Sequence, residues 1–179
     1  MKKLSIQDLC LIGAFAAIII VLGQFSIPMP YGVPMTLQTF VIPLAGIILG
    51  AKRGTLATLV YVMLGAVGLP VFAGFAGGLS IVLGPTGGFI LSFPLMAWFA
   101  GKGSETRNVV WSFAGLIVGT FVNYLCGMIM FSLITSNTLA TAFFACVLPF
   151  LPTGVLKILG AAILGLSIKK LLTKRNILV

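Results

Sequence analysis

Apolar residues run along this chain in six stretches, separated by short segments that are polar or rich in proline and glycine. About 20 mostly apolar residues let a helix cross a bilayer, so each stretch is a candidate membrane span. The predicted spans cover residues 5–24, 37–50, 54–69, 85–101, 111–135 and 149–172. The pattern therefore predicts an all-α integral membrane protein with six transmembrane helices.

Local signals indicate where several of these spans begin or break. Ser5, with Asp8 three residues later, is a capping pair that starts the first helix. Three prolines between residues 28 and 34 forbid continuous helix there, and Pro43 is expected to interrupt the short second span. Residues 65–88 contain eight glycines, so this connection is not expected to be plain helix.

Composition agrees with a membrane location. Hydrophobic residues make up 60% of the chain and charged residues 7%, against about 45–50% and about 25% in soluble domains. Six spans use roughly 120 of the residues at about 20 each. We expect residues 1–179 to form a single transmembrane domain with no room for a separate soluble one.

The charges predict how the chain is oriented. Ten of the 11 Lys and Arg residues lie before the first span, after the second and fourth spans, or at the end of the last span. The connections 25–36, 70–84 and 136–148 contain none. By the positive-inside rule both termini face the cytoplasm, in a multi-pass membrane protein surrounded by lipid.

The same charges exclude several classes of function. The cations punctuate apolar runs and form no wetted basic face, so no nucleic-acid partner is expected. With no His and 2 acidic residues, the chain has no group of side chains suited to a metal, so none is expected, and no cofactor either. An intramembrane enzyme is disfavoured because acid–base work would fall to Lys157, Tyr or Cys.

Lys157 is the one cation out of place. It lies about nine residues into the last predicted span, where an unpaired ammonium group is costly. Asp8 and Glu105 are the only acidic residues in the sequence, and both belong at the predicted cytoplasmic ends of their spans. We expect the anionic group of a ligand to be its partner, with water or backbone carbonyls holding it otherwise. The alternative is that Lys157 snorkels to the interface.

Other polar and aromatic residues fall in the same outer half. Each polar one either contacts a ligand or bonds to a neighbouring helix. The apolar connection 69–83 either forms a lid or dips into the interface. The candidates beside Lys157 are Thr36, Gln38 and Thr39 on the second span, Phe72 in the connection, Thr86 and Phe89 at the start of the fourth span, and Asn123 and Tyr124 on the fifth.

Gly13 and Ala17 form a pair of small residues on the first span. Such a pair lets another backbone approach closely, so this face either docks a partner or packs inside the protein.

Four motifs together resemble the BioY family, the biotin-specific S components of energy-coupling factor (ECF) transporters. They occur in the family's order over nearly the whole chain, and the fourth precedes Lys157 by five residues. The motifs are Val33-Pro-Met-Thr-Leu-Gln-Thr39, Gly65-Ala-Val-Gly-Leu-Pro-Val-Phe-Ala-Gly74, Gly84-Pro-Thr-Gly-Gly-Phe89 and Pro149-Phe-Leu-Pro152.

The resemblance implies a six-helix S-component-like bundle with an outer biotin pocket, coupled to a transmembrane T component and two ATPases. It implies that Lys157 meets the biotin carboxylate and that Gly13 and Ala17 dock the T component. We expect Phe72 and Phe89 to pack the ring and chain of biotin. A solitary carrier of biotin or another small amphipathic carboxylate is the alternative function.

One position departs from the family pattern. The family has Pro-Gly-Asp ahead of the lysine, and this chain has Pro152-Thr153-Gly154. The aspartate that would hold the polar ureido ring is absent, and Thr153, Asn123 and Gln38 are candidates to replace it. The change bears on ligand identity or affinity and admits a related carboxylate such as dethiobiotin.

Overall fold

The computed structural model describes residues 4–106 and 108–175. Helices dominate it, with a two-residue antiparallel strand pair and short 3₁₀ turns in the connections. The helices are α1 (Ile6–Gly23), α2 (Gln38–Leu49), α3 (Ala51–Ala66), α4 (Leu79–Val82), α5 (Gly87–Glu105), α6 (Val109–Thr135), α7 (Leu139–Cys146) and α8 (Leu151–Lys174). The strands are β1 (Ser26–Ile27) and β2 (Met35–Thr36), and the 3₁₀ turns are η1 (Pro30–Gly32), η2 (Ala73–Phe75) and η3 (Leu148–Phe150).

Each predicted span contains one long helix, namely α1, α2, α3, α5, α6 and α8. Among the described residues, three helical segments are long and apolar enough to cross a membrane: Ile6–Gly23, Val109–Thr135 and Leu139–Lys174. The start of α1 is capped as predicted, because Asp8 N donates to Ser5 Oγ (3.1 Å) and Ser5 N donates to Asp8 Oδ2 (2.9 Å).

The expectation for Pro43 is wrong. α2 continues through this residue without a break, and Pro43 is buried. Proline removes one N–H donor and constrains its own φ to a helical value. Pro43 is the sixth residue of α2, so only its backbone hydrogen bond to Thr39 is lost. The tightly packed surroundings keep the helix continuous past this residue.

Two further differences concern the connections. α3 begins at Ala51, so Lys52 and Arg53 belong to its first turn and Gly50 alone separates it from α2. Gly50 has φ +83°, a left-handed conformation that favours glycine. The connection 67–86 contains no long helix, as predicted, but it includes the short α4, and α7 lies in a connection where no helix was predicted.

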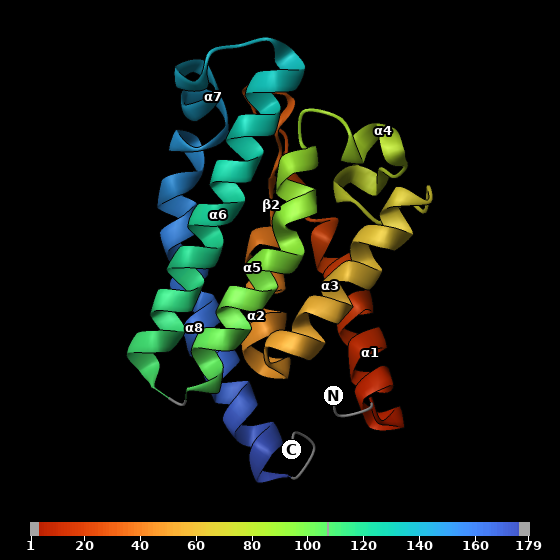
Figure 1. The fold of residues 1–179 in the computed structure, drawn as a ribbon, viewed down its shortest axis with the longest axis vertical. Coiled ribbons are helices and arrows are strands. Elements are labelled where there is room, and N and C mark those ends of the chain that lie inside the picture. The colour runs from red at the N-terminus through yellow and green to blue at the C-terminus, as the bar shows by residue number, and fades with distance from the viewer. Residues whose placement is uncertain (1–3, 107, 176–179) are drawn as a thin grey trace.

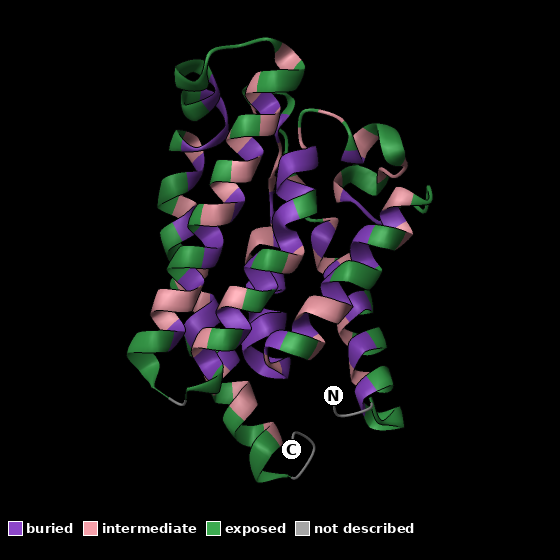
Figure 2. Ribbon diagram, in the orientation of Figure 1, coloured by how far each residue is buried: buried purple, intermediate pink, exposed green. Residues whose placement is uncertain are grey.

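α5 occupies the middle of the bundle and packs against α6, α2 and α3 (Figure 1). α2 is buried almost all round, whereas α1, α6 and α8 expose large apolar side chains outward (Figure 2). A soluble protein buries such residues, so this inside–outside pattern suits a lipid environment. α1 begins and α8 ends at the same end of the molecule, the lower end in Figure 1.

Candidate functional site

A cavity of about 150 Å³ lies in the upper half of the bundle, where β2, the start of α5 and the start of α8 meet. Its wall is mostly apolar and contains one charged side chain, that of Lys157. The lining residues are Val33, Pro34, Thr36, Gln38, Thr39, Phe72, Ala73, Ala76, Ile81, Thr86, Phe89, Ile90, Phe93, Tyr124, Phe150 and Lys157.

Lys157 is held at the cavity by uncharged partners. It is the seventh residue of α8, and its Nζ donates to the Thr36 carbonyl (2.7 Å) and to Thr39 Oγ1 (2.9 Å). An ammonium group has three donors, so one is left for a ligand. The side chain therefore faces the cavity and does not snorkel to the interface.

Within residues 4–106 and 108–175, no carboxylate pairs with Lys157. Among the described residues, the ion pairs join Arg53 to Asp8 and Lys102 to Glu105 (3.3 Å). Both acids, Asp8 and Glu105, lie at the end of the bundle opposite this cavity, as expected from the sequence. The cavity consequently presents one uncompensated positive charge inside an apolar wall.

A polar network fixes the amide of Gln38 beside this cation. Thr36 Oγ1 donates to Gln38 Oε1 (2.9 Å), and Gln38 Nε2 donates to the hydroxyl of Tyr61. Gln38 and Tyr61 are buried, with exposed fractions of 5% and 0%. The second N–H of the Gln38 amide makes none of these bonds and remains a possible donor. The network therefore determines which polar atoms are available at the cavity wall.

Two aromatic rings form the apolar wall, and each rests on a glycine of a neighbouring helix. A Cβ on Gly65 of α3 would overlap the Phe72 ring, and a Cβ on Gly127 of α6 would overlap the Phe89 ring. Phe72 also packs edge-on against Tyr61, with ring centroids 5.6 Å apart. The glycines thus let both rings retract far enough to leave the cavity open.

Gln24, which was not predicted, anchors the connection that covers the cavity. At the end of α1, its Nε2 donates to the Val71 carbonyl (3.0 Å) and its Oε1 accepts from Phe75 N (2.9 Å). An antiparallel β-bridge between Phe72 and Ala76 joins two parts of the same connection. As a result Phe72 turns inward and is buried, while Phe75 is exposed.

The cavity does not include two of the predicted residues. Asn123 is fully buried between α6 and α5, where its Nδ2 donates to the Phe89 carbonyl (2.9 Å) and to Ser92 Oγ (2.8 Å). Thr153 Oγ1 donates to the Phe150 carbonyl (3.1 Å). Asn123 therefore bonds to a neighbouring helix, and Thr153 bonds within its own turn. A polar side chain inside a membrane span can be satisfied in this way without contacting a ligand.

The remaining predicted ligand residues do line the cavity, from five separate segments: Thr36, Gln38, Thr39, Phe72, Thr86, Phe89, Tyr124 and Lys157. Sequence reasoning missed the apolar residues Val33, Pro34, Ala73, Ala76, Ile81, Ile90, Phe93 and Phe150. Their residue types do not distinguish a cavity wall from a core. Gly13 and Ala17 lie on the exposed face of α1, with no atom within 4 Å of a Cβ at Gly13.

Comparison with known proteins identifies the family. The family model described as the BioY family matches residues 1–174. The chain belongs to the BioY family. Among its relatives are the biotin transporter BioY of Thermotoga maritima, 38% identical over 91% of this chain and 96% of the relative, and the probable biotin transporter BioY of Pyrococcus horikoshii, 39% identical over 89% and 94%.

A solved structure shares the fold of this BioY chain. The crystal structure of the S-component for biotin from an ECF-type ABC transporter superposes with a TM-score of 0.85, at 27% identity over 92% of each chain. The helical bundle is therefore that of an ECF S-component, a part of a transporter and not an enzyme.

Gly154, where this BioY chain departs from the motif expected for its family, lies beside Tyr124. A Cβ at Gly154 would be 2.7 Å from the Tyr124 hydroxyl, which donates to the Phe150 carbonyl (3.3 Å). No side chain fits at position 154 unless Tyr124 moves. The hydroxyl of Tyr124 thus occupies the space that a side chain at position 154 would need.

Proposed function

We propose that this chain is the membrane subunit that captures biotin from outside the cell and imports it together with a T component and two ATPase subunits. One observation carries the proposal: Lys157, the one charged side chain among the described residues that line this cavity, lies in a mostly apolar wall. Biotin is an amphipathic monoanion and matches this arrangement, whereas a polyphosphate would need several cations. The family and the S-component fold support the assignment.

Each part of biotin has a matching part of the cavity. The carboxylate pairs with the ammonium of Lys157, and the apolar surroundings strengthen the attraction between the two charges. The ring system and the valerate chain pack against Phe72 and Phe89. The polar side chains of Thr36, Gln38, Thr86 and Tyr124 also line the cavity and offer hydrogen-bonding groups to the polar atoms of the ligand. Thr153 and Asn123 have no place in this arrangement, because other partners hold them away from the cavity.

The chain's orientation is part of the proposal. Residues 1–179 form one transmembrane domain with six spans, and both termini are cytoplasmic. The cations of the described residues support it, because those outside the cavity belong to segments that meet at the end where α1 begins and α8 ends: Lys52, Arg53, Lys102, Lys169, Lys170, Lys174 and Arg175. Lys2, Lys3 and Arg107, also used in the sequence argument, lie outside the described residues.

Single cysteines placed at the two ends test this orientation. In a cysteine-free background, a membrane-impermeant maleimide should label Ala140→Cys in intact cells, because position 140 is exposed at the α7 end. Lys52→Cys, exposed at the opposite end, should react only after the membrane is permeabilised. Labelling of position 52 in intact cells would show that the orientation is reversed.

The exposed face of α1 is the proposed docking surface for the T component. Replacing Gly13 and Ala17 together by leucine should lower biotin uptake by about tenfold in cells that also express the T and ATPase components, a loss of about 1.4 kcal/mol in association. Biotin binding to the purified variant should be unchanged, since neither residue lines the cavity. Uptake and binding are both followed with radiolabelled biotin.

The control is Ser167→Leu, which places one leucine at an exposed position of α8. If this control lowers uptake as much as the α1 variant does, the α1 face is not a specific docking surface for the T component. Full accumulation by the unmodified chain without T component and ATPases would make it a solitary carrier.

A further inference from the structure

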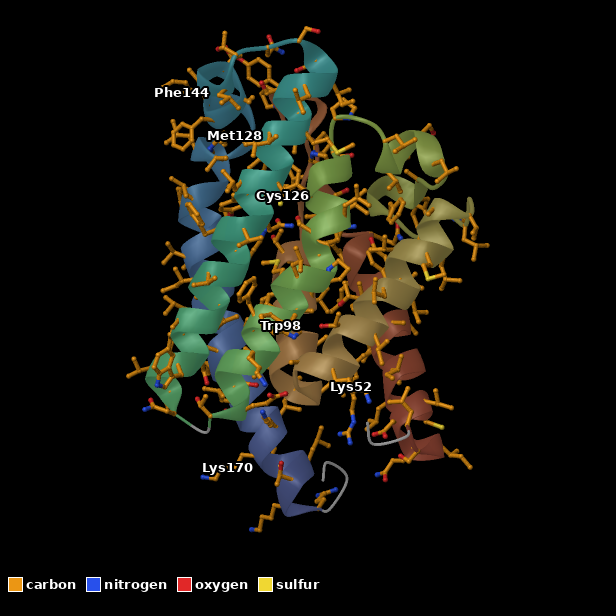
Figure 3. All side chains as sticks on the ribbon, viewed as in Figure 1. Lys52, Trp98, Cys126, Met128, Phe144 and Lys170 are labelled. Carbon is orange, nitrogen blue, oxygen red and sulfur yellow. The ribbon has the colours of Figure 1, made fainter. Side chains whose placement is uncertain are left out.

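A second cavity, of about 930 Å³, opens at the end of the molecule opposite the proposed biotin site. α3, α5 and α8 enclose it together with the starts of α1 and α6. Figure 3 shows Lys52 of α3 and Lys170 of α8 at this lower end. Five cationic side chains line the cavity: Lys52, Arg53, Lys169, Lys170 and Lys174.

The cavity keeps a positive charge after its acids are counted. Asp8 and Glu105, the two acidic residues of the whole sequence, both line it, so five cations and two carboxylates leave a net charge of +3. Both carboxylates hold partners already. Asp8 pairs with Arg53, and Glu105 accepts from the backbone N–H of Ala51 (2.9 Å) and from Lys102 (3.3 Å).

Part of this cationic lining is built into the bundle. Lys169 Nζ donates to both the carbonyl and the hydroxyl of Ser104 on α5, each at 3.0 Å. Ser104 is itself buried, and its hydroxyl lies 3.1 Å from the Ile47 carbonyl. These contacts position the ammonium group of Lys169 at the cavity wall. Lys170 and Lys174 are exposed one turn apart on α8 and extend the cationic rim.

The wall beneath the cations is apolar. Ile48, Leu49 and Leu166 line the same cavity. A cationic rim over an apolar wall at the end of a membrane helix matches a molecule that carries an anionic head and a hydrocarbon tail. We propose that this cavity binds a phosphate group, and that its occupant is the headgroup of an anionic phospholipid whose acyl carbons contact the apolar wall.

The proposal is tested on the full chain purified in neutral detergent, with lipid adducts counted by native mass spectrometry. Phosphatidylglycerol should form a one-to-one adduct, and zwitterionic phosphatidylcholine should bind far more weakly. Lys174→Ala should weaken the adduct about fivefold and the Lys170→Ala/Lys174→Ala variant about 30-fold, since each lysine beside an anionic headgroup contributes about a factor of five. A thermal melt of each variant checks that it is folded.

Arg175→Ala is the matched control, because it removes the same charge from the next residue, which does not line the cavity. It should leave the adduct within about twofold of the unmodified chain, since charge beyond direct contact is screened. Equal losses for Lys174→Ala and Arg175→Ala, or equal binding of both lipids, would overturn the proposal. Displacement of phosphatidylglycerol by millimolar inorganic phosphate would support the phosphate site and assign it a soluble source.

Discussion

Replacing Lys157 by methionine should weaken biotin binding about 150-fold, equivalent to about 3 kcal/mol, the usual cost of removing one member of a buried charge pair. The ammonium group is the only charge in the cavity lining, so nothing else can balance the carboxylate. Methionine keeps the length and apolar stem of lysine. The dissociation constant is measured with radiolabelled biotin on the purified chain.

A neutral ligand separates the charge from every other contribution of Lys157. Biotinamide, in which a carboxamide replaces the carboxylate, should bind the unmodified chain much more weakly than biotin does. The Lys157→Met variant should bind the two ligands about equally. Should the variant still prefer biotin as strongly as the unmodified chain does, Lys157 would not be the carboxylate partner.

Folding is checked in the same experiment. Removing a partly buried ammonium group that has only neutral partners should not lower the stability of the empty protein, because its desolvation cost disappears with it. The matched control is Lys102→Met, an exposed lysine that lines neither cavity. Its biotin affinity should equal that of the unmodified chain.

Gly46→Ala should strongly destabilise the bundle. A Cβ at Gly46 of α2 would overlap the backbone carbonyl of Ala97 on α5, and Gly46 also meets Gly54 of α3, whose own Cβ would lie 2.7 Å from the Gly46 Cα. Backbone atoms cannot rotate away, so three helices would have to separate. We expect a loss of about 3 kcal/mol, the upper part of the usual range for overpacking, measured as reduced thermal stability in detergent.

Gly13→Ala is the control for this substitution. Gly13 is also a helical glycine, but no atom lies within 4 Å of its Cβ position. Alanine there should leave stability unchanged or raise it by up to about 1 kcal/mol, the helix-propensity difference. If Gly46→Ala melts at the same temperature as Gly13→Ala, the close approach of α2 to α5 is not a determinant of stability.

Much of the helix layout could be predicted because the membrane imposes it on local sequence. Backbone polar groups must be satisfied within a span, so apolar stretches become helices whatever their neighbours are. The capped start at Ser5 was predicted correctly for the same local reason. Pro43 was not, because a proline near a helix start costs one hydrogen bond, and the burial of α2 outweighs that cost.

Lys157 could be singled out from the sequence because the free-energy cost of placing an ammonium group in a membrane span depends on its charge and its depth. The sequence shows both directly. Residues whose role depends on partners could not be singled out in this way. Asn123 and Tyr124 are adjacent polar residues in one span, yet Tyr124 lines the cavity while Asn123 bonds to α5. One residue along a helix is a turn of about 100°, and only packing decides which face meets a cavity.

The sequence by itself determined that the chain is a helical membrane protein, which family it resembles, and that one cation, Lys157, lies within a span with no acidic residue near it in the sequence. Those properties follow from hydropathy, charge count and motif order. Only the tertiary structure decided that Thr36 and Thr39 hold the Lys157 ammonium, that Gly65 and Gly127 make room for two aromatic rings, and that the cations at the other end surround a cavity. These contacts join residues far apart in the chain, and no local pattern records such distances.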